Sequence, residues 1–213
     1  VFGKMYYRMA LDYLKILYTM PYEGLPILCL VSREQNTGKS TFFKLLKAIF
    51  GNNALQIGNS DLSNDFNGFW TSKLVIGVDE TFIEKKMILE KIKSLATSDN
   101  IVMNKKGRDQ EEVAFFGKFL LMSNNEDNFI NASEEDTRFW VIKVPVIEKK
   151  DLDVRLMEKM IDEIPALLHF LSKRKMQHPV KMTRFWFPDE AIKTEALRKV
   201  IEQSKQAIQK ELK

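Results

Sequence analysis

The stretch that decides the fold is EQNTGKST, residues 34–41. The apolar run at residues 25–31 before it has the length and branching of a buried strand, and residues 39–50 after it carry apolar side chains at helical spacing. A strand, a glycine-containing loop and a helix in this order are the context of a phosphate-binding loop. Backbone N–H groups at the helix N-terminus would surround phosphate oxygens, Lys39 would reach the β- and γ-phosphates, and Ser40 would bind Mg²⁺. The residues expected to contact the nucleotide are Asn36, Thr37, Gly38, Lys39, Ser40 and Thr41.

One position departs from the full pattern, which begins with Gly five positions before Gly38; here that position is Arg33. Gly is useful there because it accepts positive φ and lets the backbone approach a ligand. We expect Arg33 to weaken the match without removing it, since the Gly-Lys-Ser-Thr end carries the phosphate and metal contacts. The alternative is a strand-to-helix turn that contains Gly-Lys-Ser by coincidence.

The composition is that of an ordinary soluble globular protein. The chain has 213 residues, of which 45% are hydrophobic and 29% charged, enough for one sizeable core. No apolar run approaches the roughly 18 residues that a membrane span needs, and no secretory signal opens the chain. The chain starts without Met, so we expect it to begin inside a longer polypeptide. The single Cys29 cannot form an internal disulfide, which favours a reducing, cytoplasmic setting.

Predicted strands alternate with predicted helices along the chain. Beyond the first strand, apolar runs predict strands near residues 55–57, 73–80, 119–122 and 139–146, and helical periodicity marks residues 6–17, 83–96, 151–175 and 189–213. This order predicts an α/β fold with a mostly parallel central sheet flanked by helices, plus a C-terminal helical part. The expected division is an N-terminal helix at 1–24, a P-loop ATPase core at 25–147 and a C-terminal helical subdomain at 148–213.

Two acids, Asp79 and Glu80, end the predicted strand at residues 73–80. Ligands of parallel sheets bind beyond the carboxyl ends of the strands, and we expect this strand to neighbour the phosphate-binding loop. Successive side chains point in different directions there, so the two acids can take different tasks. We assign Asp79 to Mg²⁺ and Glu80 to the attacking water. The alternative is two solvated acids that open a loop.

Two further candidates lie at strand ends. Asn124 follows the strand at 119–122, and its amide can donate to the γ-phosphate or the attacking water, although Asn is also a common turn residue and Asn125 is an adjacent candidate. Arg138 begins the strand at 139–146, and its guanidinium could stabilise charge on a neighbour's nucleotide if the subunits form a ring. The alternative for Arg138 is a surface ion pair with Glu134, Glu135 or Asp136.

The polar segment at residues 99–112 carries a cluster of positive charge. Extended flanks around 101–103 and 113–116 surround a tip that contains Lys105, Lys106 and Arg108. Cations on a projecting hairpin suit a nucleic acid backbone. A solvated charged turn is the alternative.

Taken in order, these segments resemble the superfamily 3 helicases of viruses, phages and plasmids, an AAA+-related group, and most of all the helicase part of phage-type primase–helicase proteins. The resemblance covers about residues 25–145. It rests on Gly38-Lys39-Ser40-Thr41, Asp79-Glu80, Lys105-Lys106-Gly107, Ser123-Asn124 and Arg138. It implies ATP and Mg²⁺ as cofactors, a hexameric ring with the site between subunits, and single-stranded DNA as the partner. The catalytic residues it implies are Lys39, Glu80, Asn124 and Arg138.

The leading hypothesis is therefore an ATP-driven helicase domain that moves on single-stranded DNA, with a possible primase domain on the same chain and no membrane partner. A P-loop kinase is the first alternative, but it would need an acceptor pocket and an Arg-bearing lid, of which the sequence offers no clear version. A non-hydrolysing nucleotide-binding assembly module is the second. Arg33 keeps that option open and Glu80 argues against it.

Overall fold

The computed structural model describes residues 1–79, 86–127 and 129–211. The helices, 3₁₀ turns and strands of this part of the chain are α1 (Gly3–Thr19), β1 (Ile27–Val31), α2 (Lys39–Phe50), η1 (Gly51–Asn53), β2 (Ala54–Ile57), α3 (Asn59–Ser63), β3 (Val75–Asp79), α4 (Lys86–Leu95), β4 (Asn100–Met103), β5 (Glu111–Ala114), β6 (Lys118–Ser123), β7 (Phe139–Lys143), η2 (Lys149–Asp151), α5 (Leu156–Asp162), α6 (Ile164–Lys173), α7 (Asp189–Ile192) and α8 (Glu195–Glu211).

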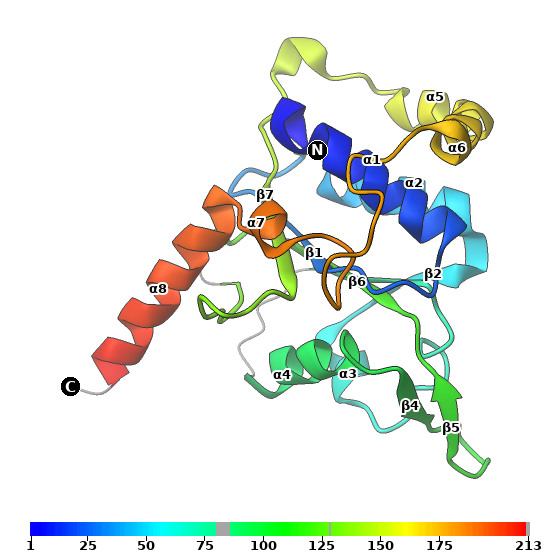
Figure 1. The fold of residues 1–213 in the computed structure, drawn as a ribbon, viewed down its shortest axis with the longest axis vertical. Coiled ribbons are helices and arrows are strands. Elements are labelled where there is room, and N and C mark those ends of the chain that lie inside the picture. The colour runs from blue at the N-terminus through cyan, green and yellow to red at the C-terminus, as the bar shows by residue number, and fades with distance from the viewer. Residues whose placement is uncertain (80–85, 128, 212–213) are drawn as a thin grey trace.

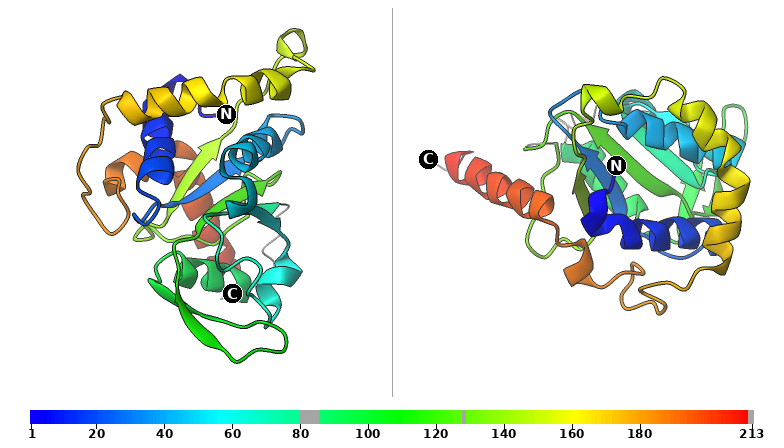
Figure 2. Two further views of the ribbon diagram at one scale, coloured as in Figure 1. Left: turned by 90° about the vertical axis from the view of Figure 1, so that its right-hand side faces the viewer. Right: turned by 90° about the horizontal axis from the view of Figure 1, so that it is seen from above.

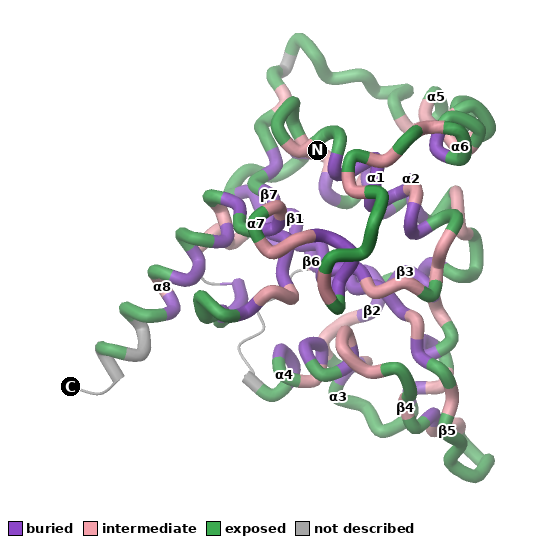
Figure 3. The backbone as a smooth tube through the Cα atoms, viewed as in Figure 1, coloured by how far each residue is buried: buried purple, intermediate pink, exposed green. Residues whose placement is uncertain are grey.

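A five-stranded parallel sheet forms the centre of the molecule, with strand order β2-β3-β6-β1-β7, and β4 and β5 form a separate antiparallel hairpin (Figure 1). β1 and β6 are buried along their whole length, as expected for strands of a parallel sheet that has helices on both faces. Figure 3 shows this burial concentrated on the sheet, whereas the hairpin tip is exposed. The predicted α/β fold with a mostly parallel sheet is confirmed.

The acidic strand β3 lies two places from β1 in the sheet. β1 pairs with β6 and β7, so β3 is not its neighbour and β6 lies between them. The chain between β3 and β6, which contains α4 and the hairpin, is long enough to return β6 to the place beside β1. The register aligns Val31 of β1 with Ser123 of β6, and Asp79 of β3 with Met122 of β6. All three strands therefore end at the same edge of the sheet.

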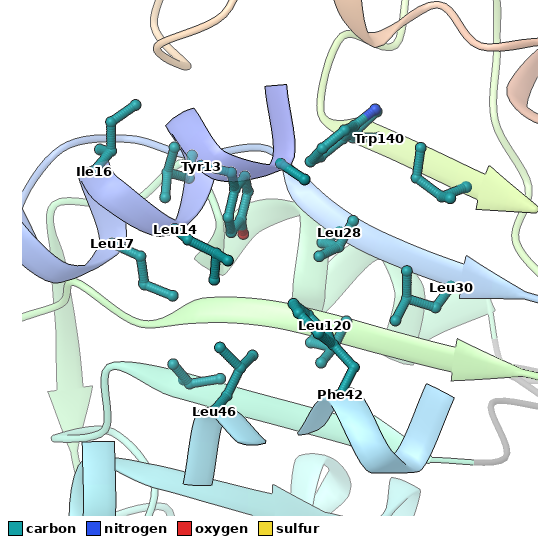
Figure 4. Close-up of a cluster of buried hydrophobic side chains, with 14 of the residues drawn as sticks. Tyr13, Leu14, Ile16, Leu17, Leu28, Leu30, Phe42, Leu46, Leu120 and Trp140 are labelled. Atoms are coloured by element: carbon teal, nitrogen blue, oxygen red, sulfur yellow. The ribbon is translucent and has the colours of Figure 1, made fainter. Parts of the chain in front are cut away.

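Alternate residues of each strand face opposite sides of the sheet, and each side has its own apolar core. Leu28 and Leu30 lie in the core that α1 and α2 cover (Figure 4), whereas Ile27, Cys29 and Val31 lie in the core that α4 and α8 cover. Burying one such aliphatic side chain contributes about 1.5–3 kcal/mol. The strand that leads into the predicted phosphate-binding loop is thus held from both sides, and Cys29 is a buried free thiol.

The helix predicted at residues 151–175 is two helices, α5 and α6. Pro165 lies in the first turn of α6, where its missing N–H is tolerated, but a proline cannot continue a preceding helix. α6 packs against α1, and α5 packs against α2.

Asp12 of α1 is fully buried and connects this helix to a distant part of the chain. Its carboxylate pairs with Arg174 and accepts hydrogen bonds from the backbone N–H groups of Gln177 at 2.8 Å and His178 at 2.9 Å. The aromatic run at residues 185–187 is also buried, and Trp186 and Phe187 belong to the core that α1 and α2 cover.

The helix predicted at residues 189–213 is also divided, because Thr194 interrupts it. The Thr194 hydroxyl donates to the carbonyl of Val141 in β7 and accepts a hydrogen bond from the N–H of Leu197 at 3.1 Å, which caps α8. α8 packs against β7 and then extends away from the sheet (Figure 2). No helix among the described residues combines the length and apolar character that a bilayer span requires.

Candidate functional site

The loop between β1 and α2 has the backbone shape that its sequence predicts. Gly38 is the residue before α2 and has φ of 93°, in the region that favours glycine. Asn36 has φ of 58° and is the one non-glycine residue with positive φ in the described part of the chain. Arg33 does not share this conformation, so the position that departs from the motif does not require glycine here.

The side chain of Arg33 is directed to two acids in the loop after β6. Its guanidinium pairs with Asp127, and its backbone N–H donates to Oε1 of Glu126 at 2.9 Å. The other Glu126 oxygen accepts from Lys143 Nζ at 2.8 Å. Burial alone would raise the pKa of Glu126, but the hydrogen bonds from Lys143 and Arg33, with their charges, lower it below its usual value. This partly exposed cluster connects Arg33, at the start of the predicted phosphate-binding loop, to the loop after β6.

Lys39 is folded against its own loop. Its side chain is buried, 8% exposed, and Nζ lies 3.3 Å from the carbonyl oxygens of Ser32 and Glu34 and 3.4 Å from Oγ1 of Thr37. These hydrogen bonds are long, and an anion in the loop would be a stronger partner for the ammonium group. Burial lowers the pKa of Lys39, while the charges of Asp79 and Glu126 act in the opposite direction.

A cavity of about 480 Å³ lies at this edge of the sheet. Its lining includes all six residues expected to contact the nucleotide, together with Asp79 from the end of β3 and Asn124 from the end of β6. The common carboxyl edge of β1, β6 and β3 explains why segments far apart in sequence meet there. The structure thus brings together most of the predicted site residues.

The metal ligands predicted from the sequence are compatible with Mg²⁺. The Ser40 hydroxyl and the Asp79 carboxylate line the same cavity and are the hard oxygen ligands that this ion prefers. Asp79 Oδ2 also accepts a hydrogen bond from the Gln56 amide at 3.2 Å. Within the described ranges, no three or more His, Cys, Asp or Glu side chains lie close enough together to hold a metal ion on their own. Glu80, predicted to orient the attacking water, lies outside the described residues.

The two adjacent asparagines after β6 have different surroundings. Asn124 lines the cavity. Asn125 shapes the turn: its N–H donates to Ser123 Oγ at 3.0 Å, and its Oδ1 accepts from the N–H of Asp127 at 2.9 Å. The geometry therefore favours Asn124 as the residue that can contact a ligand.

Arg138 lies at the opposite edge of the sheet from the cavity. It precedes β7, and its carbonyl accepts a hydrogen bond from the N–H of Ile27 at the start of β1, at 2.7 Å. Its guanidinium binds the buried Asp136 in two-pronged geometry, with Nε–Oδ1 at 2.8 Å and Nη2–Oδ2 at 3.1 Å. Arg138 therefore pairs with one of the three acids considered in the alternative, but this acid, Asp136, is buried and not at the surface.

The basic segment forms the predicted hairpin of β4 and β5, which projects from the body of the molecule (Figures 1 and 2). Lys106 and Arg108 are exposed at the tip, where Gly107 has φ of 74°. Lys105 is half-buried because its side chain lies over Gly68, where an added Cβ would be 2.4 Å from Lys105 Cγ.

The sequence reasoning missed a loop that is bound to this hairpin. Asn67 accepts from the N–H of Asn104 at 2.7 Å and donates to the carbonyl of Val102 at 2.9 Å. Phe66 and Phe69 flank Asn67 and remain 45% and 48% exposed. The signal available in the sequence was a pair of aromatic residues within a polar stretch. The prediction also missed Lys44, one helical turn beyond Ser40, and residues 147–157, both of which contribute to the cavity.

The fold is shared with a known phage protein. Two structures of the C-terminal region of NrS-1 match with TM-scores of 0.75 and 0.76 and with 20% and 19% identity; each match covers 92% of this chain, and 46% and 47% of those chains. In sequence, the chain is 27% identical over 115 residues to the DNA Primase-polymerase of Nitratiruptor phage NrS-1, which covers 52% of this chain and 16% of that protein. The chain thus spans less than half the length of these relatives.

The resemblance to phage replication proteins is confirmed at the level of the fold, while the superfamily 3 assignment stays a prediction. A family match covers residues 30–138, from the end of β1 to Arg138, and so includes the cavity-lining loop, Asp79, Asn124 and the hairpin. This match spans half of the chain. The chain belongs to the family described as "Family of unknown function (DUF5906)".

Proposed function

We propose that the chain is an ATP-hydrolysing motor domain of a replication protein, a P-loop ATPase of the AAA+-like, superfamily 3 type that moves on single-stranded DNA. The observation that carries the proposal is the convergence of Lys39, Asp79 and Asn124, from three separate elements, on one cavity of about 480 Å³. A cavity of this size accommodates a nucleotide. The sequence similarity to a phage DNA Primase-polymerase supports a role in replication.

Each residue at the cavity has a distinct task in this proposal. Lys39 leaves its long contacts with loop oxygens and binds the β- and γ-phosphates, and Asn124 donates to the γ-phosphate or orients the attacking water. Ser40 and Asp79 would hold Mg²⁺, which when bound supplies positive charge that offsets that of the phosphates. Glu80, the next residue after Asp79, orients the water.

Arg138 acts in this proposal only on the nucleotide of a neighbouring subunit, because its own cavity lies at the other edge of the sheet. A ring of subunits, six in related proteins of this type, would bring it to that position. The guanidinium would exchange the carboxylate of Asp136 for a phosphate, which has matching two-pronged geometry.

The hairpin supplies the proposed contact with DNA. Lys105, Lys106 and Arg108 bind the phosphate backbone, and the adjoining Phe66 and Phe69 offer ring faces on which bases stack. Asn67 holds the aromatic loop against the hairpin, so both kinds of contact move as one unit.

The test is phosphate release from ATP by the complete protein, with and without single-stranded DNA. We expect DNA to stimulate turnover, and Lys39→Ala and Glu80→Gln each to abolish most of it. Lys173→Ala, an exposed lysine at the end of α6, is the matched control and is expected to leave turnover unchanged. Turnover that is indifferent to DNA and to both substitutions contradicts the proposal. Phosphate transfer to an acceptor would indicate a kinase instead, and tight ATP binding with no phosphate release would indicate a non-hydrolysing assembly module.

A further inference from the structure

The cavity has a second set of lining residues whose chemistry does not suit phosphate. They come from residues 147–157, which follow β7 and include η2 and the start of α5; we name this the capping segment. Five of its lining side chains are apolar and two are acidic, namely Ile147, Leu152, Val154, Leu156 and Met157, with Asp151 and Asp153. Apolar groups gain nothing from a phosphate, and carboxylates repel it.

Several of these apolar side chains are left uncovered by the protein itself. Val154 is 100% exposed, Leu152 is 56% exposed and Leu156 is 41% exposed, and α5 buries no residue. Large apolar side chains beside a cavity become favourable when a ligand covers them, at about 25 cal/mol for each Å² removed from water. Because the predicted phosphate-binding loop lines the same cavity, the ligand that would cover these apolar side chains is one that carries phosphate.

The capping segment nevertheless has a defined conformation. Asp153 accepts hydrogen bonds from the N–H of Arg155 at 2.9 Å and from Lys159 Nζ at 2.6 Å, and its carbonyl accepts from the N–H of Leu156 at 3.1 Å. The N–H of Asp151 donates to the carbonyl of Glu148 at 2.8 Å. The Asp153 carboxylate is thus occupied within the segment, whereas Asp151 takes part in the turn through its N–H and also lines the cavity.

The two linings together match the two ends of a nucleoside triphosphate. We propose that the capping segment is the nucleoside-binding part of the site: Leu152, Val154 and Leu156 cover the base, and Asp151 accepts hydrogen bonds from the ribose hydroxyl groups. Carboxylate acceptance from a ribose hydroxyl is established chemistry for nucleotide recognition. Lys39 and Lys44, which line the same cavity, would bind the phosphates. This inference rests on the proposed function, since it requires a triphosphate in the loop.

The experiment compares two Mg²⁺-loaded ligands of the complete protein by calorimetry, ATP and inorganic tripolyphosphate, which lacks a nucleoside. The variant is Leu152→Ser with Val154→Ser. The matched control is Val180→Ser with Met182→Ser, two apolar side chains that are 64% and 66% exposed outside the cavity. We expect the first pair to weaken ATP about tenfold and to leave tripolyphosphate unchanged, and the control to change neither. Lys39→Ala is expected to weaken both ligands.

Asp151→Asn tests the ribose contact. It is expected to reduce the preference for ATP over dATP by several-fold while tripolyphosphate binding stays the same. The inference is overturned if the Leu152/Val154 variant binds ATP like the wild type, or if it loses ATP and tripolyphosphate equally, which would indicate an effect on the loop. Wild-type protein that binds tripolyphosphate but not ATP also overturns it, while leaving the phosphate-binding loop intact. Wild-type protein that binds neither ligand rejects the proposed function itself, and the inference with it.

Discussion

The predicted phosphate-binding loop and the hairpin both carry positive charge, but they present it in opposite ways. Lys39 is buried, and its ammonium group is surrounded by oxygens of its own loop. Lys106 and Arg108 lie in solvent at the tip of a projecting hairpin. A buried, pre-positioned cation suits one anion at one place, whereas exposed cations suit a polyanion that slides past them. Substitutions in the two regions are therefore expected to change different properties of the protein, and by different amounts.

The largest expected effect is at the buried cation. Lys39→Ala is expected to lower ATP turnover by about 10²–10³-fold, because it removes the pre-positioned donor proposed to bind the β- and γ-phosphates. Phosphate release at saturating ATP measures this, with Lys173→Ala as the control. A loss of less than about tenfold would mean that the buried lysine is no more critical than a surface one.

The aromatic pair beside the hairpin is expected to give the next largest effect. Phe66→Ala with Phe69→Ala removes two stacking surfaces, each worth about 1–3 kcal/mol per base, so DNA affinity is expected to fall at least about thirtyfold. The salt dependence of binding stays the same, because no charge is lost. Fluorescence anisotropy with a labelled single strand measures both quantities. Phe170→Ala, which removes a ring that is 48% exposed on α6, is the control and is expected to have no effect.

The hairpin lysines are expected to change the salt dependence most clearly. Lys105→Ala with Lys106→Ala removes up to two phosphate contacts, each worth a slope of about 0.7 in the plot of log affinity against log salt, so the slope is expected to decrease by about 1.4. ATP binding without DNA is expected to stay constant. The control is Lys173→Ala with Lys175→Ala, which removes the same amount of positive charge at exposed positions outside the hairpin. An unchanged slope would remove the hairpin from the DNA contact.

A smaller effect is expected at the position that departs from the motif. Arg33→Gly breaks exposed ion pairs with Glu126 and Asp127, which are worth about 0–1 kcal/mol, so ATP affinity is expected to change less than about fivefold. Arg33→Ala separates the loss of the side chain from the gain of backbone freedom. A large gain in affinity for Arg33→Gly alone would show that the backbone at this position approaches the ligand.

The smallest effect concerns pH. The pKa of Glu126 is lowered in the folded chain from its usual 4.5, so its contribution to stability is complete above that value and is lost as the pH falls through the lowered pKa. The difference in unfolding free energy between wild type and Glu126→Gln is expected to be constant at neutral pH and to shrink only below about pH 4.5. Urea denaturation at several pH values measures it. A difference that already declines near pH 6 would contradict the lowered pKa.

The sequence predicted the parts of the site that depend on local pattern. EQNTGKST between an apolar run and a helical run was enough to predict the loop, and alternating apolar runs were enough for the parallel sheet. Asp79 and Asn124 were found because polar residues that follow buried strands collect at one edge of such a sheet.

The remaining features depend on contacts between distant segments, which local pattern does not determine. The place of β6 between β1 and β3 follows from a long connection. The capping segment is a loop after the final strand with no motif of its own, and it joins the site only because that strand is beside β1. Thr194 divides a helix through a hydrogen bond to β7, a partner more than 50 residues away.

The buried carboxylate of Asp12 has a practical consequence for anyone who shortens this chain. A fragment that stops before residue 174 would keep the first helix but remove both the guanidinium and the backbone donors that neutralise the acid at its centre. Leaving one member of such a pair alone inside a protein costs about 3–5 kcal/mol, a large part of the total stability of a domain. Trimmed versions for expression should also keep α8, because Leu197, Val200 and Ile201 of this helix are buried in the core on the other face of the sheet.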